Sequence, residues 1–302
     1  MDLPGPYSGG SNEPISAGYW SLAQPSDTLE SDRVLEDEDE IGLKDPQWRD
    51  VPEAERRPGT QYYSVARIRI KFQGEVAYGT GFMVTEDIMV TAAHCVYDWN
   101  RNRTGPAQSI KAYFGYENKT WTEIRHGSMT IVSTKWMTPG DGRKNDLALV
   151  RLSPRYATDI YGYSLPPILP FKYPGLSWSG NEWLFIPGHP RDRGDNGLRM
   201  HESSGYVRWN LSQDNMLLGY GISTFGGLSG APVVLSDRKT VVAIHVSGDR
   251  AKGKNFACPI GPCGVSLGPF IRFFEGQYAS LGRVRYEGEL SIQDVNLLSY
   301  NS

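Results

Sequence analysis

The sequence predicts an all-β protein, and two observations carry this prediction. The 302 residues include 34 glycines, 20 prolines and 17 tyrosines, which are spread through short apolar runs. Turn-forming residues between short apolar runs are typical of proteins built from many strands. The second observation is alternation, because Ile68, Ile70 and Phe72 alternate with basic residues at the two-residue period of a half-buried strand.

The charge and hydropathy of the chain argue against two kinds of partner. A net charge of −3, from 31 basic and 34 acidic residues with no basic cluster, is not typical of a nucleic-acid-binding protein. No apolar run approaches the roughly 20 residues that span a bilayer, so the chain is not expected to be an integral membrane protein. The start of the chain lacks the basic and apolar stretches of a secretory signal.

Residues 1–60 are expected to form an acidic leader or propeptide that is largely disordered. Gly, Ser and Pro are frequent at its start, and residues 36–40 are all acidic. This composition offers few apolar side chains for a packed core.

An N-terminal β unit is expected over residues 61–165. Segments 79–84 and 88–91 predict a hairpin whose second strand leads into His94. Further strands are predicted at 110–114, 129–133 and 147–152.

A C-terminal β unit is expected over residues 166–282, after a connection at 164–180 that is rich in Pro and Gly. Phe270, Ile271, Phe274 and Tyr278 recur at helical spacing, so a short C-terminal helix is expected to pack on this second unit. Residues 283–302 form a tail whose sequence predicts neither a structure nor a function. The strands predicted in the second unit are 183–187, 200–207, 216–220, 231–235 and 241–246.

Residues 221–234 have the features of a nucleophile loop, because Ser229 stands between glycines and leads into an apolar strand. A serine needs a neighbouring base to take its proton, and the oxyanion that forms needs backbone N–H groups. Glycines at 226, 227 and 230 allow the N–H groups of Gly227 and Ser229 to converge. A Gly-rich turn between two strands is the alternative interpretation.

Two residues of the first unit are candidates for the partners of this serine. His94 follows a predicted strand and comes after small residues, which leaves room for close packing of a general base. Asp146 precedes an apolar strand, where a carboxylate is expensive to bury unless a partner fixes it. A structural histidine and an ordinary aspartate at the start of a strand are the alternatives.

Three motifs, taken in order, resemble the His, Asp and Ser motifs of the chymotrypsin-like serine proteases. They are Thr-Ala-Ala-His-Cys at 91–95, Asn-Asp-Leu-Ala-Leu at 145–149 and Gly-Leu-Ser-Gly-Ala-Pro at 227–232. Within that clan the chain resembles the glutamyl endopeptidases, the V8 protease group. Segments 188–190, 200–205 and 244–245 also look similar to that group, and the resemblance covers about residues 62–280.

The resemblance implies two six-stranded Greek-key β-barrels with the active site between them. It implies a catalytic triad of His94, Asp146 and Ser229, with an oxyanion hole from the N–H groups of Gly227 and Ser229. The expected protein is a secreted, monomeric serine endopeptidase that acts on peptides or proteins and needs no cofactor or metal. An inactive, protease-like binding protein is the alternative.

The cysteines depart from the trypsin pattern. The partner that Cys95 would have in trypsin is missing from residues 78–83, so Cys95 is expected to be a free, buried thiol. The resemblance leaves Cys258 and Cys263 as the expected disulfide pair. A metal site is the alternative, although the chain has no second cysteine pair and no zinc-spaced histidines.

The resemblance also implies a specificity pocket lined by Thr224 and His245. A carboxylate entering such a pocket needs donors and, ideally, a positive charge, which the Thr224 hydroxyl and a protonated His245 supply. Cleavage after glutamate, less often aspartate, is therefore expected; the alternative is a core histidine with specificity for small or apolar residues. Removal of a propeptide after Arg33 would free Val34, whose amine would add a donor.

Two other motifs are set aside. Residues 227–231 approach the G-x-S-x-G elbow of α/β-hydrolases, but that fold needs its acid and histidine after the serine. Residues 248–255 approach a phosphate-binding loop, yet Asn255 stands where a Ser or Thr is required. A basic surface loop is expected there.

Overall fold

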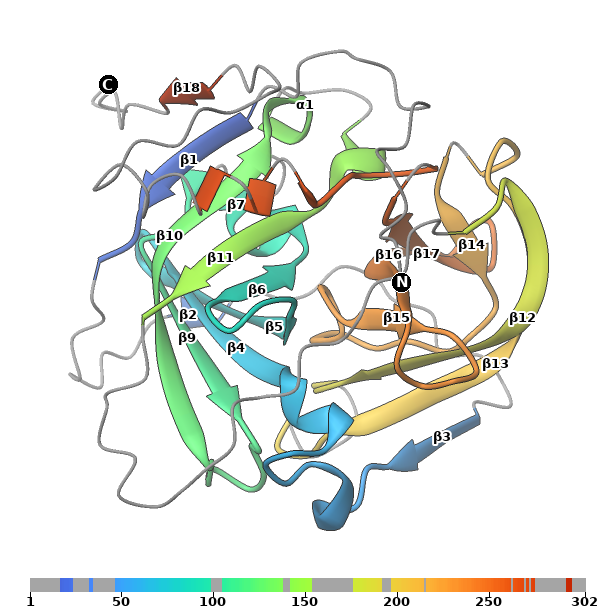
Figure 1. Cartoon of the computed structure of the whole chain (residues 1–302), viewed down its shortest axis with the longest axis horizontal. Coiled ribbons are helices and arrows are strands. Elements are labelled where there is room, and N and C mark those ends of the chain that lie inside the picture. The colour runs from blue at the N-terminus through green and yellow to red at the C-terminus, as the bar shows by residue number, and fades with distance from the viewer. Residues whose placement is uncertain are drawn as a thin grey trace, which may run out of the picture.

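Two β units lie side by side in the structure (Figure 1), a computed structural model. It describes residues 17–23, 33–34, 47–98, 105–137, 142–153, 176–191, 197–214, 216–261, 263–268, 270–271, 273–274 and 292–294, with the backbone alone at 33–34 and 292–294. The all-β prediction is confirmed. Among the described residues, no helix is long and apolar enough to cross a bilayer.

Six strands of the first unit form a closed β-barrel. Their order is β11-β6-β5-β4-β9-β10, and β10 also pairs with β11. In β4 buried and half-buried side chains alternate, as the sequence predicted, so one face of the strand lines the core. The six strands are β4 Val65–Phe72, β5 Glu75–Met83, β6 Ile88–Thr91, β9 Ser109–Phe114, β10 Glu123–Ser133 and β11 Ala148–Leu152.

The leader adds strands to this sheet. β1 (Ala17–Ser21) pairs antiparallel with β10, and β2 (Arg33–Val34) pairs parallel with β5. β18 (Ile292–Asp294) pairs parallel with β1. The side chain of Trp20 is buried, and its Nε1 donates to the carbonyl oxygen of Ala107 at 2.9 Å. The expected disorder is therefore wrong for these described leader residues. Their short apolar stretch could not form a core by itself, but Trp20 packs into the core of the first unit.

Six strands of the second unit are described, in the order β14-β17-β16-β15-β12-β13. The strand β17 includes Cys258 and was not predicted, because its first residues continue a Gly- and Lys-rich segment that was expected to be a surface loop. Residues 154–175, which hold most of the predicted boundary, lie outside the described part. The six strands are β12 Ser179–Gly188, β13 His201–Asn210, β14 Leu218–Tyr220, β15 Pro232–Val234, β16 Val241–Asp249 and β17 Lys254–Pro259.

A second part of the leader, β3 (Gln47–Asp50), pairs antiparallel with β13 at the edge of this sheet. The Arg49 guanidinium lies between two carboxylates, 2.6 Å from Glu55 and 2.9 Å from Glu202. The Tyr62 hydroxyl also donates to Glu202, whose side chain is buried. This charged cluster attaches the end of the leader to the second unit, which again differs from the expected disorder.

The helices are short, and the C-terminal one packs elsewhere than expected. Phe273 lies 4.7 Å from Tyr19 of β1, and Arg151 of β11 lies 6.0 Å from the ring of Phe274. Both contacts are with the first unit, so packing on the second unit is wrong. Phe270, Ile271, Phe273 and Phe274 have helical backbone, and the other helical segments are η1 Glu53–Glu55, η2 Gln61–Ser64, η3 Ala93–Cys95, α1 Thr134–Met137 and η4 Arg143–Asn145.

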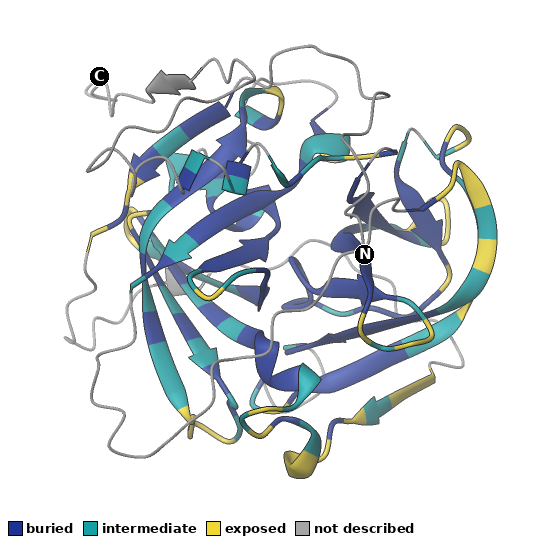
Figure 2. Ribbon diagram, viewed as in Figure 1, coloured by how far each residue is buried: buried dark blue, intermediate teal, exposed yellow. Residues whose placement is uncertain are grey.

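Burial is concentrated where the two units face each other (Figure 2). The strands there are almost entirely dark blue, whereas exposed residues gather on β3 and the start of β12. A two-stranded ribbon of β7 (Tyr97–Asp98) and β8 (Gly105–Pro106) follows the turn that carries His94. The described core therefore reaches the loops that hold the candidate catalytic residues.

Candidate active site

The loop between β14 and β15 carries Ser229 in a backbone that only glycine tolerates at two points. Gly227 has φ +95° and Gly230 has φ +88°, in the left-handed region that favours glycine. A Cβ at Gly227 would lie 2.5 Å from the carbonyl oxygen of His189, and one at Gly230 would collide with the carbonyl oxygen of Thr80. Both glycines are therefore required for close approach as well as for conformation.

Backbone hydrogen bonds hold the Ser229 loop in place. Among the described residues, two of its N–H groups have no acceptor. The N–H of Leu228 donates to Phe225, and the N–H of Gly230 donates to the carbonyl oxygen of His245 at 2.8 Å. Within the described part of the chain, the N–H groups of Gly227 and Ser229 donate to no protein oxygen. These are the two groups that the sequence predicted for an oxyanion hole.

His94 and Asp146 meet because their strands are neighbours. β6 ends just before His94, β11 begins just after Asp146, and the two strands pair antiparallel with Thr91 opposite Ala148. The His94 N–H donates to Asp146 Oδ1 at 2.9 Å, and Nδ1 of the ring lies 2.7 Å from Oδ2. Two contacts to one carboxylate fix both the backbone and the ring of the histidine.

Burial and charge act in opposite directions on His94. Desolvation alone would lower its pKa, but the Asp146 carboxylate and, after it, Cys95 raise it, and together they hold the pKa well above the ordinary value. The relative solvent accessibility of the side chain is 23% for His94 and 5% for Asp146. The imidazolium form is thus stabilised by a buried carboxylate while the ring remains accessible.

Ser229 lies at the same junction as His94. The N–H of Thr80, on β5, donates to the carbonyl oxygen of Ser229 at 2.9 Å. The thiol of Cys95, the residue after His94, lies 3.8 Å from the same oxygen. A Cβ at Gly79 would press on both that oxygen and the thiol, so Gly79 lets the two units approach here. The three predicted triad residues are therefore brought together.

The predicted pocket residues are both buried but differ in their partners. Thr224 is 0% exposed, and its hydroxyl has no hydrogen-bond partner among the described residues. His245 is also 0% exposed, and its Nδ1 lies 2.6 Å from the Tyr220 hydroxyl. The Ser247 hydroxyl, two residues farther along β16, is also buried and has no partner within the ranges described above. The sequence analysis missed Ser247, although its spacing from His245 on one strand could have indicated it.

The His245 ring is neutral at ordinary pH. Burial and, after it, the charge of His94 lower its pKa, and a backbone hydrogen bond with Phe256 opposes both, so that the pKa is about 3. The free protein therefore offers an uncharged imidazole at this position.

The expected disulfide is wrong, because Cys95, Cys258 and Cys263 are all free thiols. Cys258 belongs to the core cluster of the first unit and donates to the carbonyl oxygen of Lys144 at 3.1 Å. Cys263 belongs to the other cluster, so the two side chains pack into different cores. Burial, followed by the nearby Asp146 carboxylate, raises the pKa of the Cys258 thiol. The free, buried state predicted for Cys95 is confirmed.

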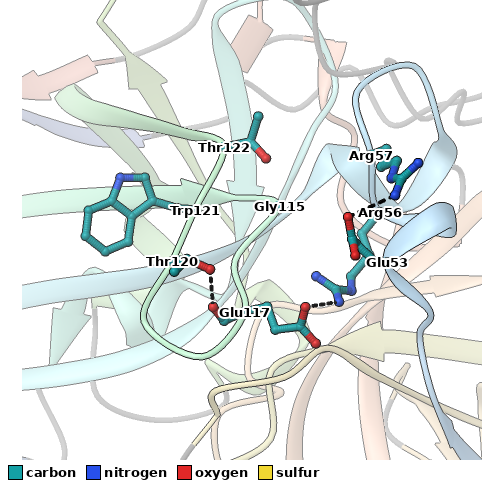
Figure 3. A pocket seen from close by; sticks show the side chains of 8 residues that line it. All are labelled: Glu53, Arg56, Arg57, Gly115, Glu117, Thr120, Trp121 and Thr122. Atoms are coloured by element: carbon teal, nitrogen blue, oxygen red, sulfur yellow. Dashed lines mark hydrogen bonds and ion pairs between the residues drawn. The ribbon is translucent and has the colours of Figure 1, made fainter.

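A separate cavity of about 190 Å³ lies between η1 and the turn that joins β9 to β10 (Figure 3). Arg56 pairs there with Glu117 at 2.5 Å, and Arg57 pairs with Glu53 at 3.0 Å. Its charged groups thus neutralise each other, and none of the predicted site residues lines it. The other lining residues are Gly115, Thr120, Trp121 and Thr122.

Comparison with solved structures gives the same fold. A Glu endopeptidase solved in complex with MPD superposes with a TM-score of 0.61 at 22% identity, covering 78% of this chain and 100% of that one. The thermostable serine protease AL20, from an extremophilic microorganism, gives 0.56 at 16% identity, covering 77% and 100%. The fold is therefore chymotrypsin-like.

One curated relative is the "Extracellular metalloprotease" of Bacillus subtilis (strain 168), 29% identical over 198 residues. The match covers 62% of this chain, and the chain spans only 57% of the length of that relative. The printed name refers to a metal, but the described residues contain no group of three or more His, Cys, Asp or Glu side chains that could hold one. The donor set for a metal is thus missing from this part of the chain.

A sequence model described as "Trypsin-like peptidase domain" matches residues 79–244. This range is more than half of the 302 residues and contains His94, Asp146 and Ser229. The chain belongs to the trypsin-like peptidase domain family.

Proposed function

We propose that this chain is a serine endopeptidase that hydrolyses peptide bonds through an acyl-enzyme. The observation that carries the proposal is the pair of hydrogen bonds between His94 and Asp146, beside the Ser229 loop. The loop adds the unused N–H groups of Gly227 and Ser229. A base, an orienting carboxylate, a nucleophile and two oxyanion donors make up the set that acyl transfer requires.

In the proposed mechanism, Nε2 of His94 accepts the Ser229 hydroxyl proton as Oγ attacks the scissile carbonyl carbon. The N–H groups of Gly227 and Ser229 stabilise the negative charge on the carbonyl oxygen. The imidazolium, held by Asp146, then donates its proton to the leaving amine as the C–N bond breaks. Water attacks the acyl-enzyme by the same route and releases Ser229.

Covalent labelling distinguishes this proposal from an inactive binding protein. A fluorophosphonate should label Ser229 in the native protein, and Ser229→Ala should lose both labelling and peptidase activity. Ser212→Ala, which changes an exposed serine bonded to Asn210, is the matched control and should keep both. Labelling that is unchanged in Ser229→Ala, or absent from the folded wild type, would reject the assignment.

We further propose a preference for glutamate on the acyl side of the cut bond. The buried hydroxyls of Thr224 and Ser247 have no hydrogen-bond partner in the described part of the chain and can donate to a carboxylate. His245 can add a positive charge if the bound acid raises its pKa, because an opposite charge nearby favours the charged form. These three groups would supply the donors that a carboxylate needs after losing its water.

The contact between Tyr220 and His245 favours a second candidate specificity. Because the ring is fully buried and already bonded to a hydroxyl, His245 can serve as a core histidine beneath a pocket for small or apolar residues. Matched peptides with Glu, Gln, Phe or Ala at the cut site separate the two candidates. Preference for Glu over Gln that disappears in His245→Ala supports glutamate, and equal rates for Glu and Gln support the second candidate.

Secretion and activation by cleavage after Arg33 complete the proposal. Secretion is supported by the likeness to the Bacillus subtilis relative, whose name calls it extracellular. N-terminal sequencing of active, secreted material tests both points. A first residue of Val34 supports processing, and a fully active chain that keeps the leader argues against it.

A further inference from the structure

The guanidinium of Arg67 has no anionic partner among the residues that the structure describes. Its central carbon lies 4.2 Å from the Tyr78 ring centre and 4.7 Å from that of Tyr116. Its Nε is buried and makes no hydrogen bond within the described part of the chain. A buried donor without an acceptor is costly, because it has lost water and gained nothing in return. The two rings hold the cation in place and leave its hydrogen-bonding capacity for a ligand.

The register of the sheet places Arg67 beside the nucleophile loop. Arg67 on β4 stands directly opposite Thr80 on β5, and paired residues project to the same face of a sheet. The Thr80 hydroxyl donates to the carbonyl oxygen of Gly227 at 2.8 Å and accepts from the N–H of His189 at 3.2 Å. Arg67 is therefore a neighbour of the residue that holds the proposed oxyanion loop.

A second set of contacts links the guanidinium to Gly227. The carbonyl oxygen of His189 lies against Gly227, and a Cβ at Gly197 would meet both this oxygen, at 3.2 Å, and Arg67 Nε, at 3.4 Å. The Arg191 side chain approaches the same point, since its Cγ lies 3.1 Å from a Cβ at Gly227. The Arg191 guanidinium also lies 5.6 Å from the Tyr78 ring. Arg67 and Arg191 thus both contact the Tyr78 ring, close to Gly227.

This flank differs from the one that holds the proposed acyl-side pocket. Thr224 lies earlier in the Ser229 loop and His245 lies on β16. Arg191, which follows β12, lies against Gly227 instead, and it shares the Tyr78 ring with Arg67 of β4. When the acyl-side side chain of the substrate fills the first flank, the peptide chain after the cut bond must run along the other flank. An extended residue advances about 3.3 Å, so the first residues after the cut bond come within reach of the arginines.

The described side chains around Arg67 include no carboxylate that pairs with it. Burial, and after it the charge of Arg67, lowers the pKa of His189 to about 3, so His189 is neutral. Arg67 forms no ion pair with a described carboxylate, and the nearby Glu117 pairs with Arg56. An acidic side chain is the ligand that offers two acceptor oxygens to such a guanidinium.

We infer that Arg67, assisted by Arg191 and Tyr78, binds an acidic side chain of the substrate on the leaving-group side of the cut bond. This inference rests on the proposed peptidase function. It adds a second acidic preference, on the opposite side of the scissile bond from the first.

Internally quenched peptides with a constant acyl side test the subsite. They carry Asp, Asn, Ala or Lys at the first or second position after the cut. In the wild type, kcat/KM should be about tenfold higher for Asp than for Asn at one of these positions, as expected for a charge-assisted pair. The ratio should fall to about one in Arg67→Met and recover in part in Arg67→Lys, because lysine keeps the charge but not the fork. Arg57→Met, at an exposed arginine, is the matched control and should keep the wild-type ratio.

Two further measurements keep the outcomes distinct. Hydrolysis by the wild type of a chromogenic anilide, which has no residue after the cut, tests the peptidase proposal without this subsite. The Asp to Asn ratio of the wild type, measured at low and at high salt, needs no variant and should shrink as salt screens the pair. Anilide hydrolysis with equal rates for Asp and Asn would overturn the subsite alone. An Asp preference that survives in Arg67→Met would overturn the role of Arg67.

Discussion

The N–H of Thr80 donates to the carbonyl oxygen of Ser229 at 2.9 Å, so a strand of the first unit holds the loop of the second. The Thr80 hydroxyl makes two more bonds, to the carbonyl oxygen of Gly227 and from the N–H of His189. One fully buried residue therefore holds the carbonyl groups of Gly227 and Ser229, the two neighbours of Leu228. The proposed oxyanion donors depend on these contacts for their orientation.

Replacing Thr80 by Val should weaken both folding and catalysis. Valine keeps the shape but leaves two buried polar groups unpaired, which costs about 1–3 kcal/mol of unfolding free energy. Loss of orientation in the Gly227 peptide should lower kcat/KM by up to about 100-fold. Urea unfolding and peptide hydrolysis measure the two effects. Thr80→Ser keeps the hydroxyl and should restore most of both; equal losses in the two variants would contradict the role of the hydroxyl.

The pH profile should show the coupling of His94 to Asp146. Since the base must be neutral, kcat/KM should rise with pH as His94 loses its proton. Asp146 raises the pKa of His94, so the midpoint of this rise should lie above the ordinary 6.5. In Asp146→Asn the midpoint should move down and kcat should fall by about 10⁴-fold. A midpoint that stays unchanged in Asp146→Asn would show that another group controls the profile.

The local patterns that predicted β4 and the hairpin of β5 and β6 are strong because one face of each strand is buried. The sequence also predicted the partners of the site, but by resemblance, since His94 and Asp146 are far apart in the chain. What joins them is the pairing of β6 with β11, a long-range contact that no local pattern specifies. The motif residues were therefore found without the geometry that makes them act together.

The failures of sequence interpretation have the same origin. The side-chain direction of Cys258 depends on β17, which pairs with β16 so that Ile244 stands opposite Cys258. Cys-x4-Cys spacing cannot show that this strand turns one thiol toward Lys144 and leaves the other in a different core. The leader strand Ala17–Ser21 was missed for a related reason, because the apolar surface that Trp20 covers belongs to strands far along the chain.

The three thiols should be silent in the native protein and reactive after unfolding. Cys95, Cys258 and Cys263 are all buried, and burial raises the pKa of Cys258 and of Cys263, which keeps them protonated. A maleimide should add to none of them in buffer and to all three in denaturant without a reductant, as mass spectrometry would report. Only one labelled thiol in denaturant would indicate a disulfide after all.

Binding of a glutamate peptide should take up a proton through His245. The pKa of this ring is about 3 in the free protein, and a bound carboxylate raises it, so uptake occurs between the free and bound pKa values. Calorimetry of Ser229→Ala near pH 5, in buffers of different ionisation enthalpy, should show uptake for a Glu peptide and none for its Gln counterpart. Tight Glu binding without uptake would mean that a neutral His245 acts as a simple donor.

The last prediction concerns the leader strand β1, which connects to the active site through a row of aromatic rings. Trp20 lies 5.8 Å from Tyr97, and the carbonyl oxygen of Tyr97 accepts from Trp136 Nε1 at 3.1 Å. The Trp136 ring lies 6.4 Å from that of His94. Loss of the Trp20 side chain should therefore loosen the segment after His94 as well as the sheet edge.

Trp20→Ala should lower the unfolding free energy by about 3–5 kcal/mol, because it leaves a cavity and unpairs the Ala107 carbonyl. Trp178→Ala is the matched control: that side chain is 55% exposed, and its loss should change stability by less than about 0.5 kcal/mol. Urea unfolding measures both, and equal effects would contradict a structural leader. Because β1 precedes Arg33 and pairs with β10 through five residue pairs, a chain cut after Arg33 should retain its N-terminal fragment. Native mass spectrometry should find that fragment bound in buffer and released in denaturant.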